Sequence, residues 1–226
     1  ITDFTTENGS FDNRPIGQNT APVAILEVDA LDANKRGEVV FDASSSNDPD
    51  AWLVSYHWDY GDGTTEIYVR EPMGIGNFTT KAVHVFRQNG TFTVTMTVKD
   101  NDNETDVATT QATVLFDLAV LNVESPYILV MPGVPVAVDV TVANNGDFYE
   151  AFNVTAYYND TLIERRLIAG MAPKTPQTLT YNWNTTGLEL GEYTLKANVT
   201  ILKEETNTTN NEYVDGSVTL ASSNIV

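Results

Sequence analysis

Hydrophobic and polar residues alternate with a period of two along most of this chain. In residues 91–98, Phe92, Val94, Met96 and Val98 fall on one side and four threonines fall on the other. This alternation is typical of a β-strand that buries one face. No segment shows the 3.6-residue period of an amphipathic helix, so the pattern predicts an all-β protein.

Turn signals separate the predicted strands into two blocks. Clusters of Gly, Asn, Asp and Pro recur roughly every 8–12 positions, which is typical of immunoglobulin-like β-sandwiches of about 100 residues. The sequence therefore predicts two tandem immunoglobulin-like β-sandwich domains, at residues 21–115 and 116–226. Residues 1–20 are polar and lack a sustained period, so we expect an N-terminal arm or linker there.

Charge and composition limit the partners and the cellular location that we expect for this chain. The chain carries 31 Asp and Glu against 12 Lys and Arg, a formal charge of −19. Such an acidic surface repels phosphate backbones, so we expect no nucleic-acid partner. No run of about 18 apolar residues is present, and we therefore expect no membrane span in this chain. Small secreted animal domains usually contain disulfides, so the absence of Cys favours a microbial, extracellular protein.

Asn-x-Ser/Thr sequons are unusually frequent. The chain has nine, where its composition would give roughly four by chance. Their asparagines lie in turn-like segments or on the polar side of predicted strands, so none needs to enter a core. We expect N-linked glycans on several of these positions: Asn8, Asn77, Asn89, Asn103, Asn153, Asn159, Asn184, Asn198 and Asn207.

Catalytic residues are scarce. The chain has two histidines, His57 and His84, and both fall on predicted strands among aromatic residues, where a structural role is the simpler interpretation. No Gly-x-Ser-x-Gly turn or phosphate-binding glycine loop is present, so the sequence predicts a non-enzymatic protein. Trp58 and Trp183 lie on apolar strand faces and are expected in the cores. Trp52 follows a turn and could instead be exposed, where it could stack on a sugar.

Several Asp and Asn residues lie at predicted strand ends and suit a hard cation. Asp48, Asp50, Asp100 and Asp102 are the candidate ligands of a calcium ion, with Asn101 beside them. No other cofactor is expected. The alternative is that these short polar side chains only form turns, in which they bond to nearby backbone groups.

The first block resembles a PKD domain, an immunoglobulin-like module. Five segments carry this resemblance in order: residues 40–50 (VFDASSSNDPD), 56–64 (YHWDYGDGT), 84–86 (HVF), 90–98 (GTFTVTMTV) and 100–102 (DND). Residues 67–81 are longer than the usual PKD loop at that position. They could form a binding loop or be a simple insertion.

The second block resembles a CARDB domain, a cell-adhesion-related module. The matching segments are residues 117–120 (DLAV), 132–133 (PG), 140–146 (VTVANNG), 191–195 (GEYTL) and 205–211 (ETNTTNN). The two resemblances together imply adhesion or scaffolding, as in archaeal surface glycoproteins, and no chemistry.

Two functions follow from these observations. The leading hypothesis is a structural subunit of a microbial, archaeal-type cell-surface assembly such as a surface layer, sheath or filament. The alternative is a non-catalytic adhesion module, binding polysaccharide or protein, within a larger secreted hydrolase or adhesin. A row of exposed aromatic side chains would favour the alternative.

The N-terminal arm is the expected connector of such an assembly. It carries Ile1, Phe4, Phe11 and Ile16 among polar residues, and an extended arm of 20 residues could reach a neighbouring subunit. We therefore expect self-association through this arm and through exposed edge strands. The alternative is an arm that folds back on its own first domain.

Overall fold

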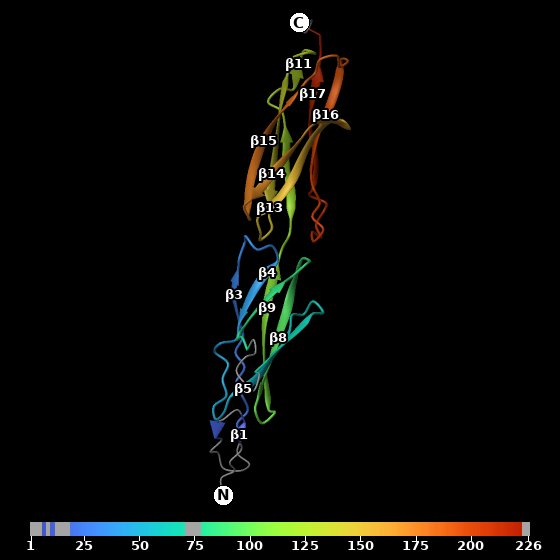
Figure 1. Ribbon diagram of the computed structural model, residues 1–226. Helices are drawn as coiled ribbons and strands as arrows, with labels where there is room; N and C mark the ends of the chain where they lie inside the picture. Colours follow the sequence, from blue (N-terminus) through green and yellow to red (C-terminus); the bar gives the residue numbers. More distant parts are fainter. Residues whose placement is uncertain (1–5, 8–9, 12–18, 71–77, 223–226) are drawn as a thin grey trace. The chain divides into compact units, whose positions relative to one another are not determined.

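The computed structural model describes residues 6–7, 10–11, 19–70 and 78–222. Within these ranges the secondary structure consists of strands, and no helix could cross a membrane. The chain divides into a first unit, residues 1–86 with 90–113, and a second unit, residues 87–89 with 114–226. Apart from a short hairpin in the arm, each unit is built from two sheets whose strands are mostly antiparallel, so the predicted fold class of two tandem immunoglobulin-like β-sandwiches is confirmed (Figure 1).

The first unit packs a three-stranded sheet against a four-stranded sheet. The first sheet has the order β3 (Glu27–Leu31), β4 (Glu38–Asp42), β7 (Lys81–Val85). The second has the order β6 (Thr65–Val69), β5 (Leu53–Asp59), β8 (Gly90–Asp100), β9 (Thr105–Val114). Alternation puts Phe92, Val94, Met96 and Val98 of β8 into the core, as the sequence predicts.

Aromatic side chains fill the middle of the first unit. Phe41 lies within 5.9–6.5 Å, between ring centroids, of Trp58, Tyr60 and Phe86, and all four are buried. The turn after β5 needs glycine at position 61, because its φ is +75° and an added Cβ would meet the Thr93 carbonyl oxygen at 2.5 Å.

The second unit packs a three-stranded sheet against a five-stranded sheet. The first sheet has the order β10 (Leu118–Glu124), β12 (Val136–Asn144), β15 (Thr175–Trp183). The second has the order β11 (Leu129–Val130), β17 (Glu212–Leu220), β16 (Gly191–Val199), β13 (Glu150–Tyr158), β14 (Thr161–Met171). The alternating valines of β12 and the ring of Trp183 form its core.

The chain changes sheets between β10 and β11. β10 pairs antiparallel with β12, whereas β11 pairs in parallel with β17 in the opposite sheet. Leu129 lies opposite Thr219 and Val130 opposite Leu220. Because β11 and β17 run in the same direction, the start of β10 and the end of β17 lie at opposite ends of this unit (Figure 1).

The described part of the arm forms a short hairpin. β1 (Thr6–Glu7) pairs antiparallel with β2 (Ser10–Phe11). Ile1, Phe4 and Ile16, which were expected to mediate assembly, lie outside the described residues, and Phe11 is described by its backbone only. In the described residues, the strand pairing of the arm is therefore with itself.

Candidate functional site

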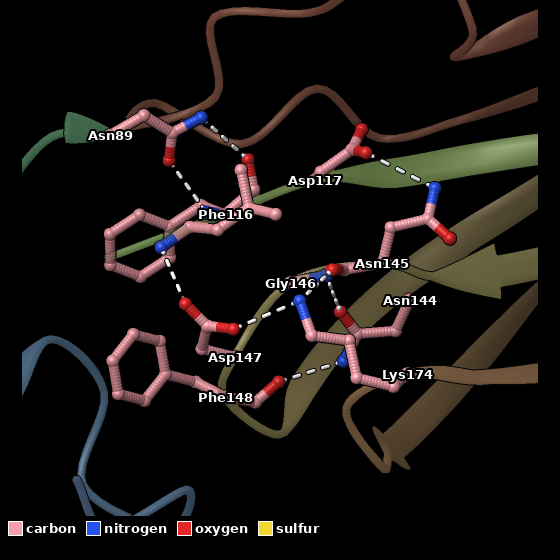
Figure 2. Close-up of polar contacts among 10 residues, drawn as sticks. Asn89, Phe116, Asp117, Asn144, Asn145, Gly146, Asp147, Phe148 and Lys174 are labelled. Carbon is pink, nitrogen blue, oxygen red and sulfur yellow. Dashed lines mark hydrogen bonds and ion pairs between the residues drawn. The ribbon is translucent and has the colours of Figure 1, made fainter. Parts of the chain in front are cut away.

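Polar side chains hold the chain at the start of the second unit, and Figure 2 shows them. The Asn89 side chain accepts a hydrogen bond from the Phe116 N–H at 2.6 Å and donates to the Phe116 carbonyl at 3.0 Å. Asn89 also donates to the Thr206 hydroxyl at 3.2 Å. One residue earlier, the Leu115 N–H donates to the Asp147 carboxylate at 2.8 Å. The N–H groups at positions 115 and 116 are thus paired by side chains, whereas the Leu115 carbonyl accepts the backbone N–H of Asp147 at 2.9 Å.

The turn after β12 adds further polar side chains to this group at the start of the second unit. Asn144 is fully buried and its amide donates to the carbonyls of Phe148 and Met171, at 2.7 and 3.0 Å. Its Oδ1 accepts the Gly146 N–H at 3.0 Å. Lys174 forms an ion pair with Asp147 at 2.9 Å (Figure 2). All polar atoms of Asn144 are therefore satisfied, and its role here is structural.

An apolar groove lies elsewhere in the second unit, beside β11. Its volume is about 430 Å³, and its lining holds no charged side chain: Tyr127, Leu129, Val130, Met131, Val134, Pro135, Ala221 and Ser222. Tyr127, Ile128 and Met131 are 54%, 79% and 51% exposed. Large exposed apolar areas on soluble proteins mark interaction surfaces. This surface was not identified from the sequence, although residues 126–138 form an uncharged run that could have indicated it.

The four candidate calcium ligands of the first unit take part in turns. Both oxygens of buried Asp100 accept hydrogen bonds, Oδ1 from the N–H groups of Asp102 and Glu104 and Oδ2 from the Asn19 amide. Asp48 accepts the N–H of Asp50 at 3.2 Å. Burial raises the pKa of the Asp48 carboxyl.

Two oxygens in the same region have no such partner. Asp48 Oδ2 and Asn101 Oδ1 are buried and accept no hydrogen bond among the described residues. The described part of the chain contains no group of three or more His, Cys, Asp or Glu side chains arranged for a metal ion. A cation here would therefore need amide or backbone oxygens as well as carboxylates.

The two histidines occupy different environments. His57 is exposed on β5, whereas the His84 ring stacks on Tyr60 at 3.9 Å between centroids and lies 2.8 Å from Asp62. Burial acts to raise the pKa of Asp62, but hydrogen bonds from Thr64 and His84 outweigh it, and the pKa is lowered. The His84–Asp62 pair fixes the turn after β5 against β7.

The tryptophans do not form an exposed row. Trp58 and Trp183 are buried, which confirms the interpretation from strand parity, and Trp52 is half-buried. The exposed aromatic side chains in the described ranges are Tyr127, Tyr149 and Tyr213.

The sequon asparagines fall into three groups. Asn103, Asn159, Asn184 and Asn207 are exposed. Asn89, Asn153 and Asn198 are half-buried, and Asn8 and Asn77 lie outside the described residues. Asn198 donates to the Tyr157 hydroxyl at 3.4 Å. A sugar on Asn89 would displace two hydrogen bonds of its amide nitrogen, so the exposed group offers the more accessible acceptors.

Comparison with known families divides the chain into two consecutive matches. Residues 19–114 match the PKD domain family, and residues 115–215 match the CARDB family. Both resemblances stated from the sequence motifs are thus confirmed.

Curated relatives and solved structures cover single parts of the chain. The collagenase ColQ1 of Bacillus cereus is 32% identical over 98 residues, which are 43% of this chain and 9% of the collagenase. A microbial collagenase of Vibrio alginolyticus is 32% identical over 95 residues, 40% of this chain and 10% of that protein. The chain therefore spans about a tenth of the length of these relatives.

Among solved structures, a CARDB domain from Pyrococcus furiosus in complex with di-metal ions is 27% identical. It covers 50% of this chain and 95% of its own, with a TM-score of 0.41. The PKD1 domain of Vibrio anguillarum Epp is also 27% identical and covers 42% of this chain and 95% of its own, with a TM-score of 0.34.

Proposed function

We propose that this chain, which consists of a PKD domain followed by a CARDB domain, is a non-catalytic binding module of a larger extracellular protein. Both families are non-catalytic, and the matching stretch makes up about a tenth of two collagenases. A module of this kind holds its parent protein on a partner and leaves the chemistry to another domain.

The apolar groove beside β11 is the observation that carries this proposal. On a chain with a charge of −19, the groove is lined by uncharged side chains and flanked by Ile128, which is 79% exposed. Its lining includes Tyr127 and Pro135. Aromatic-lined apolar grooves suit extended polypeptides in the polyproline II conformation, which need no charge partner. We infer that the partner is an extended, proline-rich fibrous protein.

Co-sedimentation with insoluble collagen fibrils tests this function. Collagen is a suitable first probe because it is an extended proline-rich polymer and two relatives are named collagenases. The double change Tyr127→Ser with Met131→Ser should weaken binding by about tenfold or more, as expected for central interface residues. Leu167→Ser is the matched control, because Leu167 is 66% exposed on β14, outside the groove lining.

The control should bind as the unchanged chain does. If the control loses as much collagen binding as the double variant, the groove is not the binding surface. Binding to cellulose or chitin, with none to collagen, would contradict a protein partner and favour a polysaccharide-binding module.

A second candidate function is a subunit of a microbial cell-surface assembly, of the archaeal surface-layer, sheath or filament type. The edge strand β14 supports it, because it ends its sheet and exposes Leu162 and Leu167 by 54% and 66%. In this proposal the arm of residues 1–20 joins neighbouring subunits head to tail. Deleting residues 1–16 should leave both domains folded and the protein monomeric. If the truncated protein still polymerises as the full chain does, the arm is not the connector.

Calcium is a further part of the proposed function of the first domain. The unpaired oxygens of Asp48 and Asn101 are hard ligands that would bind such an ion. A ligand that binds only the folded state raises the melting temperature by mass action. Asp48→Asn should abolish the rise seen with Ca²⁺ relative to chelator, whereas Asp59→Asn, at a similar turn, should keep it. If Ca²⁺ does not raise the melting temperature of the unchanged chain, Asp48 and Asn101 serve only as turn residues.

A further inference from the structure

A methionine side chain forms part of the lining of the apolar groove beside β11. Met131 is 51% exposed, whereas Met96 of the first unit and Met171 of the second are 0% and 3% exposed. Met131 is therefore the exposed methionine among the residues that the structure describes. Met73, the fourth methionine of the chain, lies outside the described residues.

A hydrogen-bonded turn holds Met131 at this position. The Met131 carbonyl accepts the Val134 N–H at 3.2 Å. The hydroxyl of Thr185, which is fully buried, accepts the Gly133 N–H at 2.9 Å and donates to the Val134 carbonyl at 2.8 Å. These bonds fix the backbone of the turn. A chemical change at the end of the Met131 side chain should therefore alter the groove surface and leave the fold in place.

The thioether of methionine is the group of this chain that hydrogen peroxide oxidises most readily, because the sequence contains no Cys. The sulfur attacks one peroxide oxygen, so that an S–O bond forms and the O–O bond breaks. The second oxygen takes the proton of the first and leaves as water. Sulfur loses two electrons and becomes a sulfoxide, while the peroxide is reduced. Because Met131 is exposed, this reaction should be faster there than at the two buried methionines.

The sulfoxide would disturb the contact between the groove and a proline-rich partner. Oxidation converts an apolar side chain into a polar one, whose oxygen accepts hydrogen bonds. A proline-rich polypeptide offers many carbonyl acceptors but lacks an N–H donor at each proline. A bound partner would therefore bury the new oxygen and supply few donors for it. Burial of a polar group without a hydrogen bond costs free energy, so the partner should bind the sulfoxide form more weakly.

We propose that Met131 is an oxidation site that regulates the groove. The thioether form binds the partner, and the sulfoxide that hydrogen peroxide produces releases it. This inference rests on the proposed function of the groove. Methionine sulfoxide reductases return the sulfoxide to the thioether, so the change is reversible. Binding is then strong where peroxide is scarce and weak where peroxide accumulates.

Peptide mass spectrometry of the full chain, treated in its folded state with hydrogen peroxide, tests the modification. The peptide that carries Met131 should gain one oxygen atom while the peptides that carry Met96 and Met171 stay unmodified. Equal rates of oxidation at the three positions would overturn the assignment of Met131. This measurement involves no collagen, so its result does not depend on the proposed function.

Co-sedimentation with collagen fibrils after the same treatment tests the regulation, and each protein is compared with its own untreated form. Treatment should weaken binding of the unchanged chain by about tenfold, as expected when one buried polar group is left unpaired. A methionine sulfoxide reductase should restore the binding. Met131→Leu has no sulfur at this position, so treatment should not change its binding. Met73→Leu is the matched control and should respond to treatment as the unchanged chain does.

The results separate this inference from the proposed function. If protein with oxidised Met131 binds collagen as its untreated form does, the regulation is wrong and the proposed function stands. If treatment weakens Met131→Leu as much as the unchanged chain, another residue is responsible and the inference is wrong. If the untreated chain does not bind collagen, the proposed function fails and the regulation fails with it.

Discussion

Replacing Asn89 by alanine removes the side chain that pairs with the backbone of Phe116. The unchanged side chain makes three hydrogen bonds, two to the Phe116 backbone at 2.6 and 3.0 Å and one to Thr206 at 3.2 Å. Phe116 is buried and stacks on Phe148 at 5.2 Å, so its N–H group has little access to solvent in the variant. We therefore expect Asn89→Ala to destabilise the second unit.

The expected loss follows from the net value of such contacts. A hydrogen bond contributes about 0.5–1.5 kcal/mol, and a buried donor left unpaired costs about 1–3 kcal/mol. For Asn89→Ala the free energy of unfolding should fall by about 2–4 kcal/mol. In a domain of about 100 residues, 1 kcal/mol shifts the melting temperature by about 4–8 °C. The transition of the second unit should therefore fall by at least about 8 °C.

Differential scanning calorimetry of the full chain measures this shift. Hydrogen exchange of the Val140 amide, in the core of the second unit, assigns the transition. Thr206→Ala removes only the longest of the three contacts. It should therefore lower the free energy of unfolding by less than about 1.5 kcal/mol. Asn182→Ala, at an exposed site, should have almost no effect. A shift for Asn89→Ala no larger than that of Asn182→Ala would refute the reasoning.

Three further predictions concern the backbone, pH and glycans. Gly61→Ala should lower the stability of the first unit by more than about 1 kcal/mol in urea unfolding, because φ is +75° and the added Cβ would meet Thr93; unchanged stability would contradict this. Hydrogen bonds from Ser44, and next Lys81, lower the pKa of Asp42 to about 2. The stabilisation linked to Asp42 is therefore present above its ordinary pKa near 4 and lost as the pH falls toward 2. Lys81→Met should raise this pKa in an NMR titration, and an unmoved midpoint would exclude Lys81 as a cause. In native protein, the peptides that carry the exposed sequons Asn103, Asn159, Asn184 and Asn207 should exceed their unmodified masses in mass spectrometry, and unmodified masses at all four would contradict glycosylation there.

The fold was predictable from the sequence because each strand carries its own evidence. Alternating valines mark β12, and Trp58 and Trp183 occupy the apolar parity that places them in the cores. The motifs of both families also occur in chain order, so the sequence alone identifies the two sandwiches. These signals are local, and a single chain shows them without any knowledge of tertiary contacts.

The sites were less predictable because they depend on residues far apart in the chain. The groove combines residues 127–135 with Ala221 and Ser222, which come together only when β11 pairs with β17. The sequence shows Asn89 as a sequon, but its hydrogen bonds to Phe116, 27 positions away, exist only in the folded structure.

The parallel pairing of β11 with β17 determines how the second unit responds to tension. A pull applied just before β11 and just after β17 would draw the two strands in opposite directions along their common axis. The bonds from Thr219 to Ile128 and from Ala221 to Val130, at 2.9 and 3.0 Å, are then loaded together in shear and cannot open one after another. Rupture of this pairing should therefore begin only when both of its residue pairs fail together. A domain held under tension at these positions would resist force through only two residue pairs.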